Sequence, residues 1–369
     1  MAINYPRYLK IFHEESFDSR EDLPAYFPLE LLSDPKFMEL AILDHVGKSV
    51  YRLMDEDVKR NRDIALSLVK ADPNAWRDLH EQFLADRSFV LASPSGIGYF
   101  FHRFPEKLRD DPEIVRLALE DNGYALKDAN ERFRDDEKMV SIALPSNPNA
   151  IKFVSARLLQ NRDFMLSLIT KNGVLLAFGM EKKLGSEEYE LPAFVKMNYG
   201  DDREIVLSAV ATCGRVLEYA SERLRNDREI VLLAVQHASH HPMGSESPLK
   251  YAGPELRKDK DIIREAAREC GEALKYVPDE IFADKDFLKE LLSSNASVYD
   301  YIPDELRKDA ELAIIAISQN GFMLGESPEE IRDDRDCVIA AVKKDQDAFH
   351  FASKRLRQDP EIRILAGEY

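Results

Sequence analysis

A repeating unit of 25 residues limits what this sequence can fold into more than any other feature. An acid or amide recurs three residues after a Leu or another apolar residue, and we call these residues the anchors. The anchors are Asp34, Asn61, Asp86, Asp111, Asp136, Asn161, Asp202, Asp227, Asp259, Asp284, Asp309, Asp334 and Asp359. Nine of the twelve intervals between them are 25 residues long. A fixed period of this length is typical of repeat proteins, in which each unit covers the apolar face of the next.

The residues after each anchor have the pattern of an amphipathic helix. Asp and Asn are common N-caps because their side chains accept hydrogen bonds from free backbone N–H groups. Apolar residues then occupy the third, fourth, seventh and eighth positions, as at Ile230, Val231 and Ala234, which is the spacing of one helix face. We expect a helix of about eleven residues, ended by a glycine such as Gly123 or Gly214 in the left-handed conformation.

The second half of the unit reads A-L-x-Y-A-S-x-x-L and has room for a helix of about two turns. A Ser or Pro, as at Ser221 or Pro278, then predicts a tight turn that ends on the recurring apolar residue. Two helices this short cannot bury their apolar faces alone, so successive units must stack. We therefore expect an all-α fold, an α-helical solenoid of about twelve tandem two-helix repeats with N- and C-terminal caps. Residues 1–30 would form the N-terminal helical cap and residues 31–369 the repeat array.

Two intervals between anchors are longer than the unit by seven residues or more, and each holds an insert. The interval of 41 residues has about 16 extra residues within 179–200, and the interval of 32 residues has seven extra near 237–252. Loops inserted into repeats fall on one face and are frequent binding elements. Loop growth also costs little free energy, so tolerated length variation is an equal alternative.

The charge balance restricts the class of partner. There are 51 Lys and Arg residues against 68 Asp and Glu residues, a net charge of −17. Binding a phosphate backbone needs compensating cations, so we expect no nucleic-acid partner. The same charge favours a basic protein partner and binding that weakens with salt.

Cysteine usage and hydropathy indicate the compartment. Three cysteines without a C-x-x-C pair exclude a disulfide scaffold and a Cys-based zinc site. No apolar run approaches the length of a membrane span, and the N-terminal residues lack the apolar core of a secretory signal. We therefore expect a cytoplasmic protein that does not bind membranes.

An aromatic residue recurs eight residues before the anchor, most regularly at Tyr219, Tyr251, Tyr276 and Tyr301. Aromatic side chains at such positions commonly fill gaps between units, and we favour this packing role. The alternative is a row of side chains that lines a binding face, since Tyr is enriched in interface hot spots. A partner-binding surface would then combine this column with three residues of the inserts, namely Tyr189, Phe194 and His240.

Other groups that could carry chemistry have plainer interpretations. His237 and His241 could present two imidazoles to a metal, but no carboxylate or Cys stands at motif spacing. Residues 93–98 resemble a phosphate-binding glycine loop without its Lys, and a broken first helix fits them better. An Arg two residues before many anchors, as at Arg225, is expected to pair with neighbouring acids rather than with nucleic acid. The cysteines fit inert thiols, so we predict no catalytic, cofactor-binding or metal-binding residue.

The unit L-R-x-D-x-E-I-V-x-x-A-V-x-x-N-G-x-A-L-x-Y-A-S-x-x-L resembles a bacterial repeat family catalogued as domain of unknown function 4116. Residues 224–231 (LRNDREIV) carry its pattern almost in full, and the likeness extends over residues 31–369. The resemblance implies a helical repeat array, with no established catalytic residue or cofactor. In architecture alone, the alternating short helices are also similar to variant leucine-rich repeats.

These observations favour recognition over catalysis, because stacked helices offer an extended surface. The leading hypothesis is a non-catalytic protein-interaction scaffold that presents an acidic surface to a basic protein partner. A second hypothesis is an inhibitor or immunity-type protein that blocks a basic toxin or nuclease. A third is a metal-dependent enzyme that uses the His237–His241 loop. The sequence does not indicate the oligomeric state.

Overall fold

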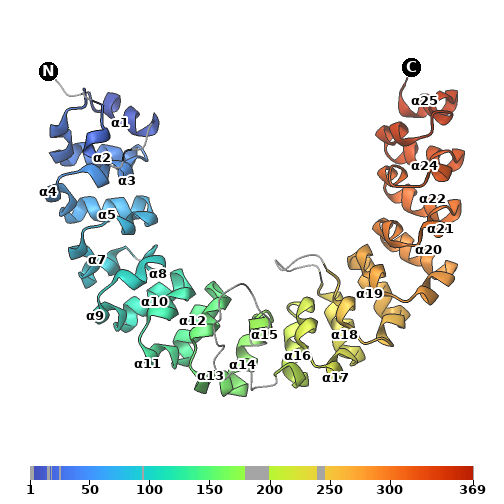
Figure 1. Cartoon of the computed structure of the whole chain (residues 1–369), viewed down its shortest axis with the longest axis horizontal. Coiled ribbons are helices and arrows are strands. Elements are labelled where there is room, and N and C mark those ends of the chain that lie inside the picture. Colours follow the sequence, from blue (N-terminus) through green and yellow to red (C-terminus); the bar gives the residue numbers. More distant parts are fainter. Residues whose placement is uncertain are drawn as a thin grey trace. The chain divides into compact units, whose positions relative to one another are not determined.

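The computed structural model describes residues 4–14, 17, 19–24, 26–93, 95–178, 199–238 and 246–368. Within these ranges every regular element is a helix and no strand occurs (Figure 1), which confirms the all-α prediction. The chain divides into two compact units, one with the described residues up to Phe164 and the other with those from Met165 on. Across the described ranges, no helix combines the length and the apolar composition of a bilayer span.

The helices follow in chain order, with 3₁₀ helices labelled η. The first unit contains α1 (Tyr5–Glu14), η1 (Arg20–Asp22), η2 (Leu29–Ser33), α2 (Pro35–Leu43), α3 (Gly47–Leu53), α4 (Glu56–Lys59), α5 (Arg62–Ala71), η3 (Pro73–Arg77), α6 (Glu81–Leu84), α7 (Arg87–Ala92), α8 (Ile97–Phe100), η4 (Phe101–Arg103), α9 (Glu106–Arg109), α10 (Pro112–Asp121), η5 (Gly123–Asp128), α11 (Glu131–Arg134), α12 (Glu137–Ser146), η6 (Pro148–Phe153) and α13 (Ala156–Gln160). The division between the units falls within α14 (Arg162–Ile169).

The second unit contains α15 (Leu175–Phe178), η8 (Tyr199–Asp201), α16 (Arg203–Val210), η9 (Gly214–Tyr219), α17 (Glu222–Arg225), α18 (Arg228–Gln236), η10 (Pro248–Tyr251), η11 (Leu256–Lys258), α19 (Lys260–Glu269), η12 (Gly271–Tyr276), η13 (Asp279–Ala283), α20 (Lys285–Ser294), η14 (Ala296–Tyr301), α21 (Asp304–Arg307), α22 (Ala310–Gln319), η15 (Gly321–Leu324), α23 (Glu329–Arg332), α24 (Arg335–Lys344), η16 (Gln346–Phe351), η17 (Leu356–Gln358) and α25 (Pro360–Ala366). In both units, we call the α-helices that begin directly after the anchors the long helices.

Each anchor caps a helix, as predicted. The Asp227 carboxylate, for example, accepts hydrogen bonds from the N–H groups of Glu229 at 3.1 Å and Ile230 at 3.3 Å. Every other anchor also accepts from a backbone N–H two or three residues later. These bonds satisfy N–H groups that have no partner within the helix, so the anchor fixes where each helix begins.

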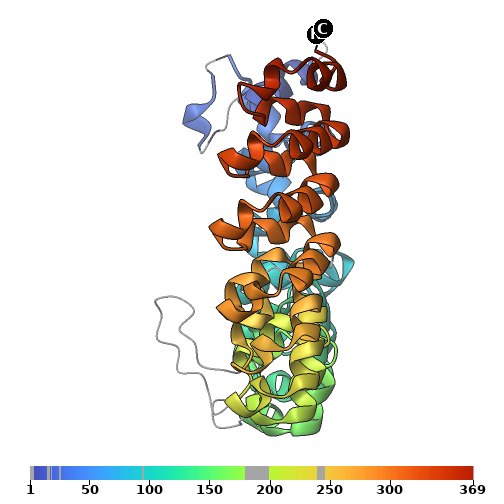
Figure 2. The same ribbon diagram turned by 90° about the vertical axis from the view of Figure 1, so that its right-hand side faces the viewer.

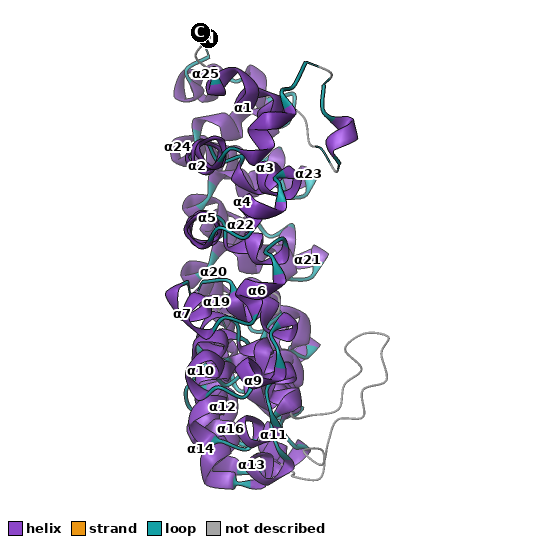
Figure 3. Ribbon diagram, turned by 90° about the vertical axis from the view of Figure 1, so that its left-hand side faces the viewer, coloured by secondary structure: helices purple, strands orange, loops and turns teal. Residues whose placement is uncertain are grey.

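The second half of the 25-residue repeat differs from the predicted single helix followed by a tight turn. In the segment from α16 to α17, η9 is a 3₁₀ helix of six residues, and α17 is a separate α-helix of one turn. Ala220 and Ser221 between them have extended backbone, with ψ of 150° and 160°, so the first helix cannot continue. The Ser221 hydroxyl then caps α17. In the second unit, the short helices α21 and α23 lie on the opposite side from α20 and α24 (Figure 3).

The glycines that follow the long helices have a different role from the predicted one. Neither Gly123 nor Gly214 has a positive φ, so the expected left-handed cap is wrong at both positions. A Cβ on Gly123 would lie 1.9 Å from the carbonyl oxygen of Ala143, and one on Gly214 would lie 1.9 Å from that of Ala234. Each glycine therefore marks the point where a 3₁₀ helix touches the backbone of the next long helix, and only hydrogen fits there.

Sequential packing of the long helices builds the core. In the second unit, α16, α18, α19, α20, α22, α24 and α25 each contact the next. Figure 2 shows the orange-to-red helices from α19 to α25 one above another. The predicted apolar positions are buried: Ile230, Val231 and Ala234 are 0% exposed. Each buried Ile or Val contributes about 1.5–3 kcal/mol, so stability comes mainly from contacts between neighbouring 25-residue repeats.

The N-terminal residues cover the first long helix of their unit. Helix α1 contacts α2, and the Tyr5 hydroxyl donates to the Asp34 carboxylate at 2.8 Å. The Phe12 ring lies 5.9 Å from that of Phe27 and 6.5 Å from that of Phe37. An aromatic cluster thus joins α1 and the residues after it to the apolar face of α2.

We expect Gly123→Ala to destabilise the protein by about 1–3 kcal/mol, because the added methyl group overlaps the Ala143 carbonyl group and the packed backbone must move. Urea denaturation followed by circular dichroism would show a lower midpoint. Ala296→Gly is the matched control, since Ala296 begins η14 as Gly123 begins η5, and its effect should stay below about 1 kcal/mol. An unchanged midpoint for Gly123→Ala would contradict the close approach of the two helices.

Candidate functional site

Four tyrosines lie at the C-terminal ends of successive 3₁₀ helices in the second unit. Tyr219, Tyr251, Tyr276 and Tyr301 end η9, η10, η12 and η14, and we call them the tyrosine row. The four helices contact one another in this order. Each tyrosine is half-buried, so part of every ring packs and part faces solvent. The four tyrosines of the column recognised in the sequence therefore lie on neighbouring 3₁₀ helices, and each is partly exposed.

Charged side chains hold the Tyr251 ring in place. The Lys250 ammonium lies 5.5 Å from the ring centroid, within the range of a cation–π interaction. It also forms an ion pair with Glu246 at 2.9 Å, and the Tyr251 hydroxyl donates to the same carboxylate at 3.3 Å. Arg215 approaches this carboxylate at 3.5 Å. Glu246 thus joins the Tyr251 hydroxyl to two cations.

A similar arrangement links the next two 3₁₀ helices. Lys275 of η12 lies 5.0 Å from the centroid of the Tyr301 ring of η14, so this cation–π contact joins neighbouring 25-residue repeats. Its ammonium group also forms an ion pair with Glu272 at 3.1 Å. Tyr251 and Tyr301 therefore each have a lysine beside the ring, and that lysine is itself paired with a carboxylate.

The hydroxyls of Tyr251 and Tyr276 remain protonated at neutral pH. Burial raises the pKa of Tyr251 to about 12, and the nearby Glu218 adds to the shift. Burial also raises the pKa of Tyr276, with a further contribution from Glu246. A neutral phenol can donate and accept hydrogen bonds, but it does not act as a base or nucleophile near pH 7. These groups are suited to recognition.

The other predicted site residues cannot be joined to this row. Tyr189, Phe194 and His240 lie outside the described residues, as do most of the two inserts. Their participation in a binding surface stays a prediction. Residues Tyr199 and Gly200, at the end of the longer insert, are described and belong to the fold: both are buried, and the Gly200 carbonyl accepts from the N–H of Ser221 at 2.6 Å.

The thiols of Cys213 and Cys337 are buried, and their environment keeps them protonated. Burial raises the pKa of both, that of Cys337 to about 12. The thiolate is the nucleophilic form of cysteine, so neither residue is activated. Cys270 is the C-cap of α19 and is half-buried.

His237 is engaged with the backbone at the end of α18. Its Nδ1 lies 3.0 Å from the carbonyl oxygen of Leu233, and its own carbonyl accepts from the N–H of Gly214 at 3.2 Å. His240 and His241 lie outside the described residues. In the part of the chain that the structure describes, no group of three His, Cys, Asp or Glu side chains has a metal-binding arrangement.

The glycine loop at residues 93–98 holds an anion of the chain itself. The N–H groups of Gly96 and Gly98 donate to the Asp121 carboxylate at 3.1 Å and 2.9 Å. Gly96 has φ of 83°, which favours glycine, and α7 before it has only six residues. The broken first helix is confirmed. The resemblance to a phosphate site has a physical origin, because the loop does bind a carboxylate.

The predicted pairing of the Arg column with neighbouring acids is wrong at several positions. Arg109 donates to the carbonyl of Phe104 at 3.0 Å, and Arg134 to that of Ala129 at 3.1 Å. Arg257 follows the same rule five residues back, with its Nε 2.9 Å from the Ala252 carbonyl. These guanidinium groups satisfy the extended residues between the 3₁₀ helix and the next short element, where backbone carbonyls have no helical partner.

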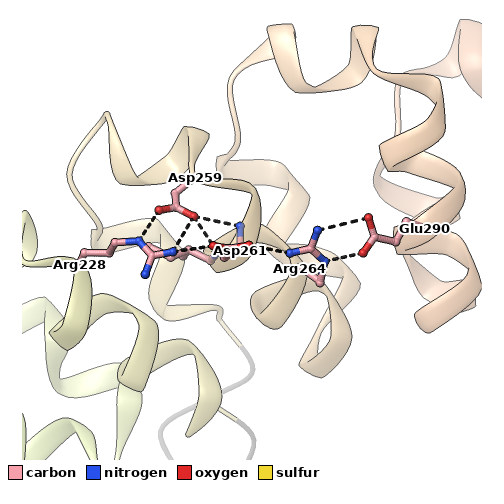
Figure 4. A network of polar contacts seen from close by, with 6 residues as sticks. Arg228, Asp259, Asp261, Arg264 and Glu290 are labelled. Atoms are coloured by element: carbon pink, nitrogen blue, oxygen red, sulfur yellow. Dashed lines mark hydrogen bonds and ion pairs between the residues drawn. The ribbon is translucent and has the colours of Figure 1, made fainter.

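A different set of cations forms the ion pairs between successive 25-residue repeats, and the sequence interpretation missed these cations. The residue directly after an anchor pairs with the next anchor: Arg228 contacts Asp259 at 2.7 Å and Asp261 at 2.7 Å. Arg264 continues the network by contacting Asp261 at 2.9 Å and also Glu290 (Figure 4). Equivalent pairs with the next anchor are Arg87–Asp111, Arg203–Asp227, Lys260–Asp284, Lys285–Asp309 and Arg335–Asp359. The signal was present as a basic residue after most anchors, one period before an acid.

The family comparison agrees with this geometry. The family model described as Domain of unknown function (DUF4116) matches residues 97–134, 202–240, 244–282 and 284–332. These four segments confirm the resemblance found in the sequence, and three of them lie beyond residue 201, where the repeat is most regular. No curated protein and no solved structure matches the chain.

The ion-pair network predicts an acid-sensitive carboxyl group. Hydrogen bonds from Lys285 and Lys289 lower the pKa of Glu311 from 4.5 to about 2. The folded state therefore holds this carboxylate charged when the unfolded state protonates it, and the stabilisation is lost as pH falls from 4.5 to 2.

NMR titration of the side-chain carboxyl should give a pKa for Glu311 near 2, and Lys285→Met should raise it. Lys354→Met is the control, since Lys354 is exposed and forms no ion pair within the described residues. An ordinary pKa for Glu311 in the unaltered protein would contradict the pairing.

Proposed function

We propose that this chain, a protein with repeated DUF4116 segments, is a non-catalytic scaffold for protein–protein interaction. Its repeats form an α-solenoid of about twelve units that presents an extended acidic surface to a basic protein partner. The partner binds across the 3₁₀ helices that carry the tyrosine row.

The tyrosine row is the observation that carries this proposal. Tyr is enriched among the residues that contribute most to binding, because a large amphipathic ring loses little conformational entropy. Tyr251 and Tyr301 already have their rings fixed by lysines, at 5.5 Å and 5.0 Å from the ring centroids. A partner would therefore meet a surface that is organised before binding, which lowers the entropic cost of association.

Sequential packing supports the solenoid. Each long helix of the second unit contacts the next, and the 3₁₀ helices from η9 to η14 also contact one another in order. Gly123 and Gly214 bring a 3₁₀ helix against the following long helix. Such contacts recur from one 25-residue repeat to the next and leave one edge of each repeat open to solvent.

The net charge of −17 supports a basic partner. Many of the cations on the long helices are already paired with carboxylates, as Arg228 is with Asp259 and Asp261. The excess of acidic groups produces a negative potential around the protein, which speeds the approach of a basic partner and is screened by salt.

The proposal of a non-catalytic role has support from what the reactive side chains do. Cys213 and Cys337 are buried thiols with raised pKa, and the imidazole of His237 is engaged with a backbone carbonyl. An inhibitor of a basic toxin or nuclease remains the second candidate, because it uses the same acidic charge. Stoichiometric loss of activity of a captured basic enzyme would favour the inhibitor over the scaffold.

The double variant Tyr251→Leu/Tyr276→Leu should reduce capture of a basic partner from host lysate by about fivefold or more, since it removes two ring surfaces but keeps apolar bulk. Quantitative mass spectrometry would compare the captured proteins at low and high salt. Tyr99→Leu is the matched control, because Tyr99 is 64% exposed but lies on α8 of the first unit. Equal capture by both variants would exclude the tyrosine row from the site.

Replacing residues 180–197 by a glycine–serine linker of equal length tests the longer insert. The replacement spares Tyr199 and Gly200, which are buried and contact the fold. If the insert binds the partner, capture should fall about fivefold or more while the circular dichroism spectrum stays unchanged. Unaltered capture would assign the insert to tolerated length variation.

A further inference from the structure

An exposed pair of aromatic rings lies on two neighbouring 3₁₀ helices near the end of the second unit. Phe322 of η15 is 47% exposed, and Phe351 of η16 is 38% exposed. Their ring centroids are 6.1 Å apart and the rings are inclined at 73°, an edge-to-face contact. Gly325 lies below Phe351, since a Cβ there would be 2.9 Å from the ring. The pair is therefore held against the backbone and turned towards solvent.

Three other rings on the 3₁₀ helices have a lysine of the chain beside them. The distances from Nζ to ring centroid are 5.9 Å for Lys127 and Tyr124, 5.5 Å for Lys250 and Tyr251, and 5.0 Å for Lys275 and Tyr301. Within the described residues, no Lys or Arg lies over Phe322 or Phe351. This pair therefore lacks the cation that those three rings have.

The residue after Gly325 is acidic, and its carboxylate interacts with a second carboxylate. Glu326 follows Gly325 in the chain and is exposed. Partial burial raises the pKa of the Asp300 carboxyl; Arg307 opposes the shift and Glu326 adds to it, so the two carboxylates are close enough to repel. Arg307 acts on the Asp300 carboxyl, and it is engaged: it donates to the Glu326 carbonyl and its guanidinium lies 5.5 Å from the Tyr299 ring. A second cation would relieve the repulsion between the carboxylates.

We propose that Phe322 and Phe351, with Asp300 and Glu326, form a docking site for a lysine- or arginine-bearing segment of a partner protein. A cationic head group lies over the ring pair, where the negative faces of the rings attract it, and the two carboxylates supply the counter-charge. The apolar stem of the same side chain covers the exposed ring surface. This inference rests on the proposed function and names one site on the surface, with the chemistry that it recognises.

The charge around the rings selects this occupant. An acidic segment or a nucleic acid would meet Asp300 and Glu326 as like charges, which costs binding energy. The first unit offers the contrasting case: Tyr124 and Phe153 form a similar edge-to-face pair at 5.1 Å, but Lys127 already lies beside it. The two pairs share their geometry and differ in the cation, so one serves as the control for the other.

The test uses the full chain and a fluorescent peptide of alternating lysine and glycine, with fluorescence anisotropy measured at low salt. An otherwise identical peptide with acetyl-lysine supplies the neutral probe. Phe322→Leu/Phe351→Leu keeps the apolar bulk and should weaken binding of the lysine peptide about fivefold, because the ring quadrupoles are lost. Asp300→Asn/Glu326→Gln should weaken it about twofold to fivefold and reduce its salt dependence. Tyr124→Leu/Phe153→Leu should leave the affinity unchanged.

Each outcome decides the proposal. Weaker binding by the first two variants alone, with no binding of the acetylated peptide, supports the site. If the intact protein binds the lysine peptide and all variants bind equally, the site is wrong while a basic partner remains possible elsewhere on the scaffold. If the intact protein does not bind the lysine peptide, or binds the acetylated one as tightly, the docking site is also wrong. Loss of the scaffold function itself would appear separately, as the absence of any salt-sensitive partner in the lysate capture.

Discussion

The close contact between a 3₁₀ helix and the next long helix is the interaction on which the described fold depends. At Gly123 and Gly214 a methyl group would lie 1.9 Å from a backbone carbonyl oxygen, so glycine is required by proximity and not by its own backbone angles. The same contact sets the spacing at which the long helices bury residues such as Ile230 and Val231 completely. Neither a long helix nor a 3₁₀ helix could bury its apolar face alone, and each is stabilised by its neighbour.

Interactions within one 25-residue repeat could be predicted from the sequence, and interactions between repeats could not. The N-caps and the buried apolar positions were predicted because a cap or a helix face depends on residues within one turn. The prediction of left-handed glycines was wrong because the carbonyl group that excludes a side chain, such as that of Ala143, comes from the next 25-residue repeat. The cations paired with the next anchor, such as Arg228, were missed for the same reason. The predicted pairing of the Arg column with acids was wrong at Arg109 because this residue donates to the carbonyl of Phe104, which lies in the extended backbone between two short helices.

Of the candidate site, the sequence predicted which residues form a column but not how they are held. Tyr251 and Tyr301 were identified from their period, whereas the lysines beside their rings and the shared carboxylate of Glu246 required the structure. These contacts give the surface its character, since they combine exposed aromatic area with fixed charge. In the proposed function, affinity depends on how many of these contacts a partner can make at once.

Hydrogen–deuterium exchange of the full chain with and without its captured partner tests most directly whether the 3₁₀ helices form the binding surface. We predict slower exchange in the complex within η9, η10, η12 and η14, where the tyrosine row lies, with exchange in the long helices unchanged. Protection confined to the long helices, or absent from residues 214–301, would contradict the proposed binding surface.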